Sequence, residues 1–166
     1  MDEFRRVSTR LPSGSFPPDD VDEPVVPGSV GDVVAGAAAD EAAAAEARRR
    51  YQSERMAALR SDPAITPLLA PGEEVLAVRR CVGYERRLAS RGKACSGRGD
   101  LYLTSARLVL LGQTTFAIGL DEIEEAMLSG GRLLLVLHDG AGMSLELERP
   151  SLLRVEIAAA RAAARS

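Results

Sequence analysis

Residues 99–111, Gly-Asp-Leu-Tyr-Leu-Thr-Ser-Ala-Arg-Leu-Val-Leu-Leu, decide the fold class of this chain. The stretch predicts two β-strands that meet at a tight turn. Leu101 and Leu103 alternate with other residue types before the turn, and Leu108 and Leu110 do so after it. A period of two is typical of a strand that places one face against a core.

Similar alternation on both sides of this stretch predicts seven strands in all. The further strands are expected at residues 75–87, around 116–120, at 123–128, at 133–138 and at 143–148, with turns at 129–131 and 139–142. Residues 133–138 are apolar on both faces, which predicts a central strand, whereas the last strand alternates as a half-exposed one should.

The pattern changes after Pro150 and predicts a C-terminal helix. Apolar residues recur there at intervals of three and four, which gives one stripe along a helix: Leu153, Ile157, Ala160 and Ala164. Ser151 is predicted as the N-cap. Strands followed by one terminal helix predict a mainly β domain, either a barrel or a sandwich with a helix at its end.

The strand-turn-strand stretch also resembles the signature of GRAM domains, which have the pleckstrin-homology (PH-like) fold. The matching positions are Gly99, Leu101, Leu103, Thr104, Arg107 and Leu108. The resemblance implies a seven-stranded barrel or sandwich over residues 62–166, with an open end that the C-terminal α-helix plugs. It also implies a binding module rather than an enzyme.

Two further segments precede this domain. Residues 1–37 are rich in Pro and Gly and carry three arginines against seven acidic residues, so we expect a disordered acidic tail. Residues 38–61 are rich in Ala, Arg and Glu, which predicts a helix. Its apolar face is thin and consists of Ala43, Ala47, Tyr51 and Ala58. Such a helix could be solvated, docked on the domain or a weak oligomerisation element, and we expect it to be only loosely held.

Composition narrows the class of protein. All basic residues but Lys93 are arginines and Asn is absent, which is typical of a GC-rich bacterial genome of actinobacterial type. A formal net charge of −3 argues against a nucleic-acid partner.

The N-terminus lacks a signal-like apolar run, and Leu133–Leu137 is the longest aliphatic run, so a cytoplasmic location is expected. Cys81 and Cys95 would then be reduced thiols, with a redox role as the alternative.

The loop after the first strand is the candidate binding site. Residues 86–98 hold five basic residues and no acidic residue, namely Arg86, Arg87, Arg91, Lys93 and Arg98. Guanidinium groups match phosphate oxygens, and glycines let backbone N–H groups approach an anion. In lipid-binding PH domains the equivalent loop holds phosphoinositide head groups, so the resemblance implies an anionic lipid ligand. A solvated charged loop is the alternative.

Nothing in the sequence indicates catalysis. The chain has one histidine, His138, two unclustered cysteines and no metal-ligand spacing, so we expect no catalytic residue, no metal and no cofactor. Two functions stay open. The basic loop could engage anionic lipid or an acidic, membrane-associated protein at the inner face of the membrane. Alternatively, an adaptor could bind a peptide at a sheet edge or between sheet and helix.

The acidic segment Asp19–Glu23 suggests one more hypothesis. It could fold back over the basic loop and mask it, because the two segments carry opposite charge. The sequence leaves the oligomeric state open.

Overall fold

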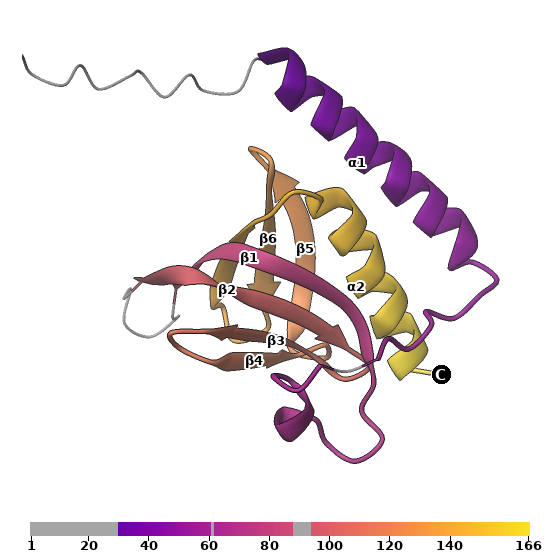
Figure 1. Ribbon diagram of the computed structural model, residues 1–166, viewed down its shortest axis with the longest axis vertical. Coiled ribbons are helices and arrows are strands. Elements are labelled where there is room, and N and C mark those ends of the chain that lie inside the picture. Colours follow the sequence, from indigo (N-terminus) through magenta and orange to yellow (C-terminus); the bar gives the residue numbers. More distant parts are fainter. Residues whose placement is uncertain (1–29, 61, 88–93) are drawn as a thin grey trace, which may run out of the picture.

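A computed structural model of the protein describes residues 30–60, 62–87 and 94–166 (Figure 1). In chain order its elements are helix α1 (Val30–Arg50), the 3-10 turn η1 (Thr66–Leu68), strands β1 (Val75–Arg87), β2 (Ala94–Thr104), β3 (Arg107–Gly112), β4 (Phe116–Gly119), β5 (Ile123–Ser129), β6 (Arg132–Leu137) and β7 (Gly142–Glu146), and helix α2 (Pro150–Ala164). The predicted tail up to residue 29 and the loop residues 88–93 lie outside the described residues.

In the described part of the chain, the strands form one antiparallel sheet in the order β4-β3-β2-β1-β7-β6-β5. Strand β1 joins the two halves of this sheet. Its residues Gly83–Arg87 pair with β2 on one side and β7 on the other, whereas Val75–Arg79 pair with β2. Between these halves the register shifts, and Cys81 adopts a positive φ of 54°. Such a bulge bends a strand, which lets β1 belong to both halves of the sheet.

The predicted fold class is confirmed: the domain is mainly β, with seven antiparallel strands and a C-terminal helix. The hairpin between β5 and β6 turns at Gly130 and Gly131, whose φ angles of 56° and 73° suit a tight two-residue turn. Strand β6 is paired on both sides, as expected for a strand apolar on both faces, although β1 lies at the middle of the sheet.

The main core lies between the curved sheet and helix α2. Inward-facing side chains of the strands meet Leu153, Ile157 and Ala160 of α2, which are about 1% exposed. These residues belong to the stripe predicted from the sequence. Burial of such side chains is the dominant favourable term in folding, so α2 is an integral part of the domain.

The face of β2 and β3 that points away from the main core is also buried. Ile65, which is fully buried, packs with Val75, Tyr102 and Val109 in a second apolar cluster. Consequently both faces of residues 101–104 and 108–110 are buried. The alternation in the sequence predicts only one buried face for these strands. The second face is buried because the segment before β1, which contains Ile65, packs on it.

Helix α1 differs from its prediction over residues 38–61. It begins earlier, at Val30, so residues 30–37 of the predicted tail are helical, and it ends earlier, at Arg50. It is also not loosely held along its whole length. Ala44 and Ala47 are buried against Val155 of α2, while Val33 and Val34 are exposed. Figure 1 shows the second half of α1 beside α2 and its first half projecting beyond the domain.

The N-terminus of α2 is capped differently from the prediction. Ser151 is not the N-cap, because the helix begins at Pro150 and Arg149 occupies the cap position without a side-chain hydrogen bond. The carboxylate of Asp40 accepts hydrogen bonds from the backbone N–H groups of Ser151 and Leu152 instead. The capping group therefore comes from α1.

Candidate functional site

The structure separates the described members of the predicted basic cluster. Successive strand residues point to opposite faces of a sheet. Arg86 places its guanidinium 5.4 Å from the ring centre of Phe116, and its buried Nε finds no hydrogen-bond partner among the described residues. Arg87 and Arg98 are exposed on the other face. Arg91 and Lys93 lie outside the described residues.

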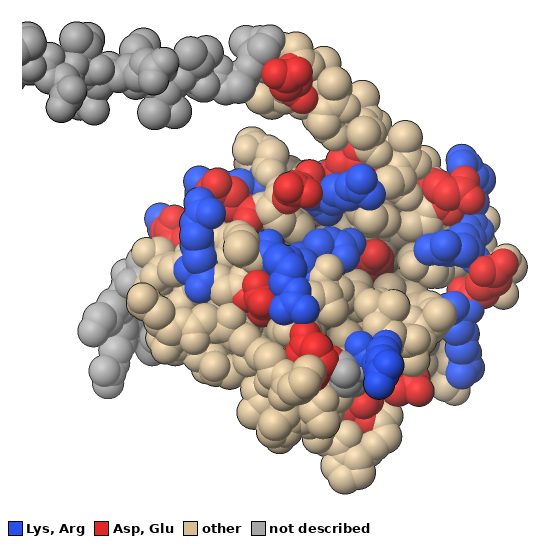
Figure 2. Space-filling view, in the orientation of Figure 1, with Lys and Arg blue, Asp and Glu red and all other residues tan. Residues whose placement is uncertain are grey.

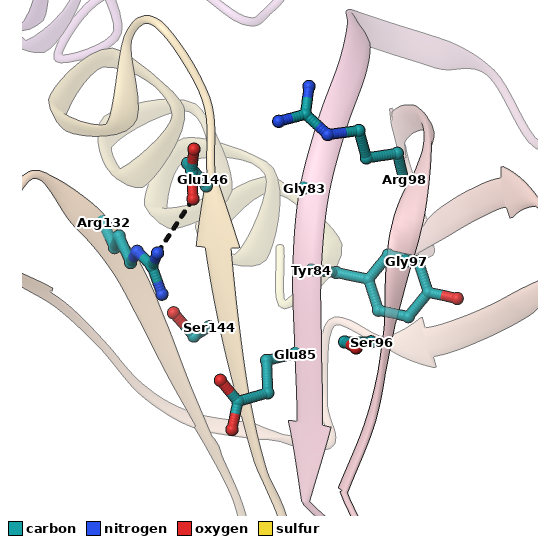
Figure 3. A pocket seen from close by; sticks show the side chains of 9 residues that line it. All are labelled: Gly83, Tyr84, Glu85, Ser96, Gly97, Arg98, Arg132, Ser144 and Glu146. Carbon is teal, nitrogen blue, oxygen red and sulfur yellow. Dashed lines mark hydrogen bonds and ion pairs between the residues drawn. The ribbon is translucent and has the colours of Figure 1, made fainter. Parts of the chain in front are cut away.

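A hollow of about 390 Å³ lies on the outer face of the sheet, next to Arg98 (Figure 3). It crosses strands β2, β1, β7 and β6, and its lining consists of Gly83, Tyr84, Glu85, Ser96, Gly97, Arg98, Arg132, Ser144 and Glu146. We refer to it as the outer hollow. None of the residues packed around Ile65 is among those that line it.

Register places the small and charged residues of the outer hollow in two rows. Gly83 lies opposite Arg98 on β2 and Glu146 on β7. Glu85, one row further along β1, lies opposite Ser96 and Ser144. Glycine and serine therefore form the floor, and charged side chains form the rim.

The two glycines of the outer hollow have different reasons to be glycine. A Cβ atom on Gly97 would lie 2.8 Å from the hydroxyl of Tyr84, so packing requires a glycine there. A Cβ atom on Gly83 would make an ordinary contact of 3.4 Å with Glu146. Glycine inside a strand is unfavourable for the fold and often marks close approach of another molecule. Gly83 is thus the residue that keeps the floor open without a packing need.

Among the described residues, some of the charged side chains around the outer hollow form ion pairs with one another, and one does not. Arg132 pairs with Glu146 at 2.9 Å, and Arg87 approaches Glu85 at 3.4 Å. Arg98 makes no ion pair with any residue that the structure describes. An anionic group above Gly83 could therefore meet a free guanidinium and the hydroxyl groups of the floor. Figure 2 shows basic and acidic side chains interspersed over the visible face rather than one basic patch.

Two of the residues on which the resemblance to GRAM domains was based, Thr104 and Arg107, stabilise the fold. Thr104 is fully buried, and its hydroxyl contacts Glu73 at 2.6 Å while accepting the backbone N–H of Arg107 at 2.9 Å. Arg107 makes two hydrogen bonds to the same Glu73 carboxylate, at 2.9 and 2.8 Å. Burial raises the pKa of Glu73, but the hydrogen bonds of Arg107 and its neighbours outweigh burial and leave that pKa below its usual value. These side chains stabilise the turn between β2 and β3.

A second polar network fixes the segment before β1. Arg80 bridges Asp62 at 2.8 Å and Asp100 at 2.5 Å, and the hydroxyl of Tyr102 donates to Asp62 at 2.7 Å. The hydrogen bonds from Tyr102 and Arg80 lower the pKa of Asp62 to about 2. The network holds the segment that carries Ile65 against the sheet.

Among the described residues, Arg98 is the one member of the predicted basic cluster that lines the outer hollow, and sequence reasoning missed the other lining residues. Gly83, Arg132 and Ser144 come from three strands, and only the strand register brings them together. A glycine in the middle of a predicted strand was the one available signal.

Two further features were considered, a metal-binding cluster and a membrane-spanning helix, and the described residues contain neither. No group of three or more His, Cys, Asp and Glu residues is placed to hold a metal ion in the described ranges. None of the described helices has the length and apolar character needed to cross a membrane.

Comparisons with known proteins were made for sequence and for structure. No protein-family model and no curated protein sequence matches the chain. Among solved structures, the C-terminal domain of an unknown protein from Leishmania infantum is 20% identical, with a TM-score of 0.42, over 57% of this chain and 92% of that domain. The Dm DCP1 EVH1 domain, solved in complex with the XRN1 DBM peptide, is 13% identical, with a TM-score of 0.41, over 69% of this chain and 99% of that one. These likenesses concern the fold alone.

Proposed function

We propose that the protein is a non-enzymatic, GRAM-related binding module that engages an anionic group through the β1–β2 hairpin. The group belongs to a lipid head group at the inner face of the membrane or to an acidic protein partner. One observation carries the proposal: Arg98 has no ion pair among the described residues and borders the outer hollow, whose floor Gly83 leaves open.

The sequence of the hairpin adds charge to this site. Residues 86–98 contain five basic residues and no acidic one. Each basic residue near an anionic membrane contributes about 1 kcal/mol of attraction, and salt screens that attraction. The binding should therefore be salt-sensitive and should depend on Arg87 and Arg98 more than on basic residues elsewhere.

Co-sedimentation of the full chain with vesicles tests the proposal. The double variant Arg87→Gln/Arg98→Gln should lose most binding to anionic vesicles, and binding should weaken between about 50 and 200 mM salt. Arg48→Gln/Arg60→Gln is the matched control. It removes the same amount of charge at two exposed arginines that lie outside the β1–β2 hairpin. Equal loss in both variants would show general charge attraction and would contradict a site at the hairpin.

A peptide adaptor is the second candidate function, and the open edge of β5 supports it. Strand β5 ends the sheet order, and its residues Ala126, Met127 and Leu128 are only partly buried. An extended peptide could add to such an edge. A protein partner that binds here should tolerate Arg87→Gln/Arg98→Gln and should lose affinity for Met127→Lys, because a charge on an edge strand discourages pairing.

The tail-masking hypothesis concerns residues outside the described ones and belongs with this proposal. Deleting residues 1–29 removes Asp19–Glu23 and leaves α1 whole. Binding to anionic vesicles at low salt should then become stronger. Unchanged binding would show that the tail does not mask the basic loop.

A further inference from the structure

Residues 53–60 connect α1 to the domain and form what we call the strap. Helix α1 ends in a turn in which the N–H of Glu54 donates to the carbonyl of Arg50 at 3.0 Å. The chain from Arg55 to Ala58 then runs without helix or strand. Figure 1 shows this connection passing the C-terminal end of α2 on its way to the sheet.

The strap lies along a strand edge that the rest of the sheet leaves free. Within the described residues, Val75–Arg79 of β1 pair with β2 on one side, and β7 reaches only Gly83–Arg87 on the other. The strap uses this free edge once, through an isolated bridge in which the N–H of Leu59 donates to the carbonyl of Val75 at 2.7 Å. An edge of this kind offers further backbone groups for pairing.

A single side chain anchors the strap in the core. Met56 is partly buried and packs on the main core, as Leu76 of β1 does. Its neighbours Arg55, Ala57 and Ala58 are exposed, and Leu59 is 46% exposed. The packing of Met56 and the hydrogen bond from Leu59 to Val75 are therefore the main contacts that hold residues 55–59.

Two hollows adjoin the strap. Hollows of about 430 and 410 Å³ both adjoin Met56 and Leu76. The first is bordered by small side chains of α2, which are Ala159, Ala160, Ala162, Ala163 and Ala164. The second is bordered by Val78 and by the ion pair between Arg79 and Glu156, at 2.6 Å.

We propose that the groove between Val75–Arg79 and α2 is a docking surface for an extended peptide of a protein partner. The peptide adds a strand to the free edge of β1 and places an unbranched apolar side chain, Met or Leu, where Met56 now lies. The strap is the resident occupant that such a peptide displaces. This surface is separate from the outer hollow, and its argument does not depend on the proposed function.

The chemistry of the groove favours a peptide over other ligands. The edge of β1 that β7 does not reach can pair with an extended main chain, whose alternate side chains then enter the adjoining pockets. The carbonyl of Val75 now accepts Leu59 of the strap, and that of Val78 accepts the Arg79 side chain at 3.0 Å.

Leu76 and the alanines of α2 border the pocket next to Met56, together with polar residues that include Glu74 and Ser105. The apolar part of this lining accepts a flexible apolar group. The charged wall is already paired, because Arg79 and Glu156 satisfy each other.

The test uses the full chain with Met56→Ala and a synthetic peptide of residues 51–60, Tyr-Gln-Ser-Glu-Arg-Met-Ala-Ala-Leu-Arg. Isotope-labelled protein is titrated with the peptide and followed by NMR. Amide shifts should concentrate at Val75–Arg79 and Ala159–Ala163. The peptide should bind this variant at least about tenfold more tightly than the unaltered chain, whose own strap competes at a high effective concentration.

The proposal would be overturned by the absence of amide shifts at millimolar peptide, by shifts elsewhere in the chain, or by equal binding of a control peptide that carries Met56→Asp. Dimerisation of the Met56→Ala chain in light scattering would also overturn it, since the occupant would then be a second copy. Should Met56→Ala fail to fold, Leu59→Pro provides the same test, because it removes the one bridging N–H at a half-exposed position.

Discussion

Asp40 caps a helix that lies far from it in the sequence. Its carboxylate accepts the backbone N–H of Ser151, 111 residues away, at 2.7 Å, and that of Leu152 at 3.0 Å. Glu41 accepts the hydroxyl hydrogen of Ser151 at 2.6 Å. The first N–H groups of a helix lack partners within it, and negative charge is favourable there. Asp40 is only 3% exposed, so this cap joins α1 to the domain as a buried contact.

Replacing Asp40 by Ala should lower the free energy of unfolding by about 1–2 kcal/mol, since an N-cap is lost and two N–H groups lose their acceptor. Urea unfolding followed by circular dichroism measures the change. Asp32→Ala is the control, because Asp32 is an exposed aspartate in the first turn of the same helix. Equal effects would mean that the long-range cap adds nothing to stability.

Thr104→Val should lower the free energy of unfolding by about 1–3 kcal/mol. The N–H groups of Ala106 and Arg107 donate to the buried Thr104 hydroxyl, and the variant removes that acceptor. Thermal unfolding gives the measurement, and Thr115→Val, in the exposed turn after β3, should change little. If Thr104→Val weakened vesicle binding while leaving stability unchanged, Thr104 would be a ligand residue and its structural role would be refuted.

Ile65→Ala should destabilise the fold by about 2–4 kcal/mol, because it empties the centre of the second apolar cluster. Leu68→Ala, three residues later and 43% exposed, should cost much less. Denaturant titration of both variants decides the point. Similar losses would indicate that residues 62–69 cover the sheet without contributing specific packing.

The stability of the domain should fall in acid through Asp62. Tyr102 and Arg80 lower the pKa of Asp62 from 3.8 to about 2. A carboxyl whose folded pKa is depressed contributes stability above its unfolded pKa and loses it as the pH falls through the folded pKa. The loss attributable to Asp62 is therefore expected between about pH 4 and pH 2.

Tyr102→Phe removes the hydroxyl that is the largest cause of this shift, so the pKa of Asp62 should rise toward its ordinary value. NMR titration of the Asp62 carboxyl carbon measures it directly. Tyr51→Phe, on α1, should leave the titration unchanged. A pKa near 2 in the Tyr102→Phe variant would assign the shift to Arg80 and to the backbone N–H groups of Ala64 and Ile65.

Local patterns were sufficient to predict the strands and the last helix. The period of two along residues 75–87 and 99–111 is a property of adjacent residues, and the observed strands follow it closely. The stripe of Leu153 and Ile157 likewise predicted the buried face of α2. For the candidate site, sequence supplied Arg87 and Arg98, whose charge is visible without any structure.

Only the tertiary structure decided the remaining features. Strand register assembles Gly83, Ser144 and Arg132 into the outer hollow, and the alternation of side chains places Arg86 on the opposite face from Arg87. The thin alanine face of α1 gave no sign of firm docking, because the contact depends on a carboxylate that meets a helix end formed much later in the chain. Sequence periodicity determines which face of an element is apolar, but which other element covers that face depends on contacts between residues far apart in the chain.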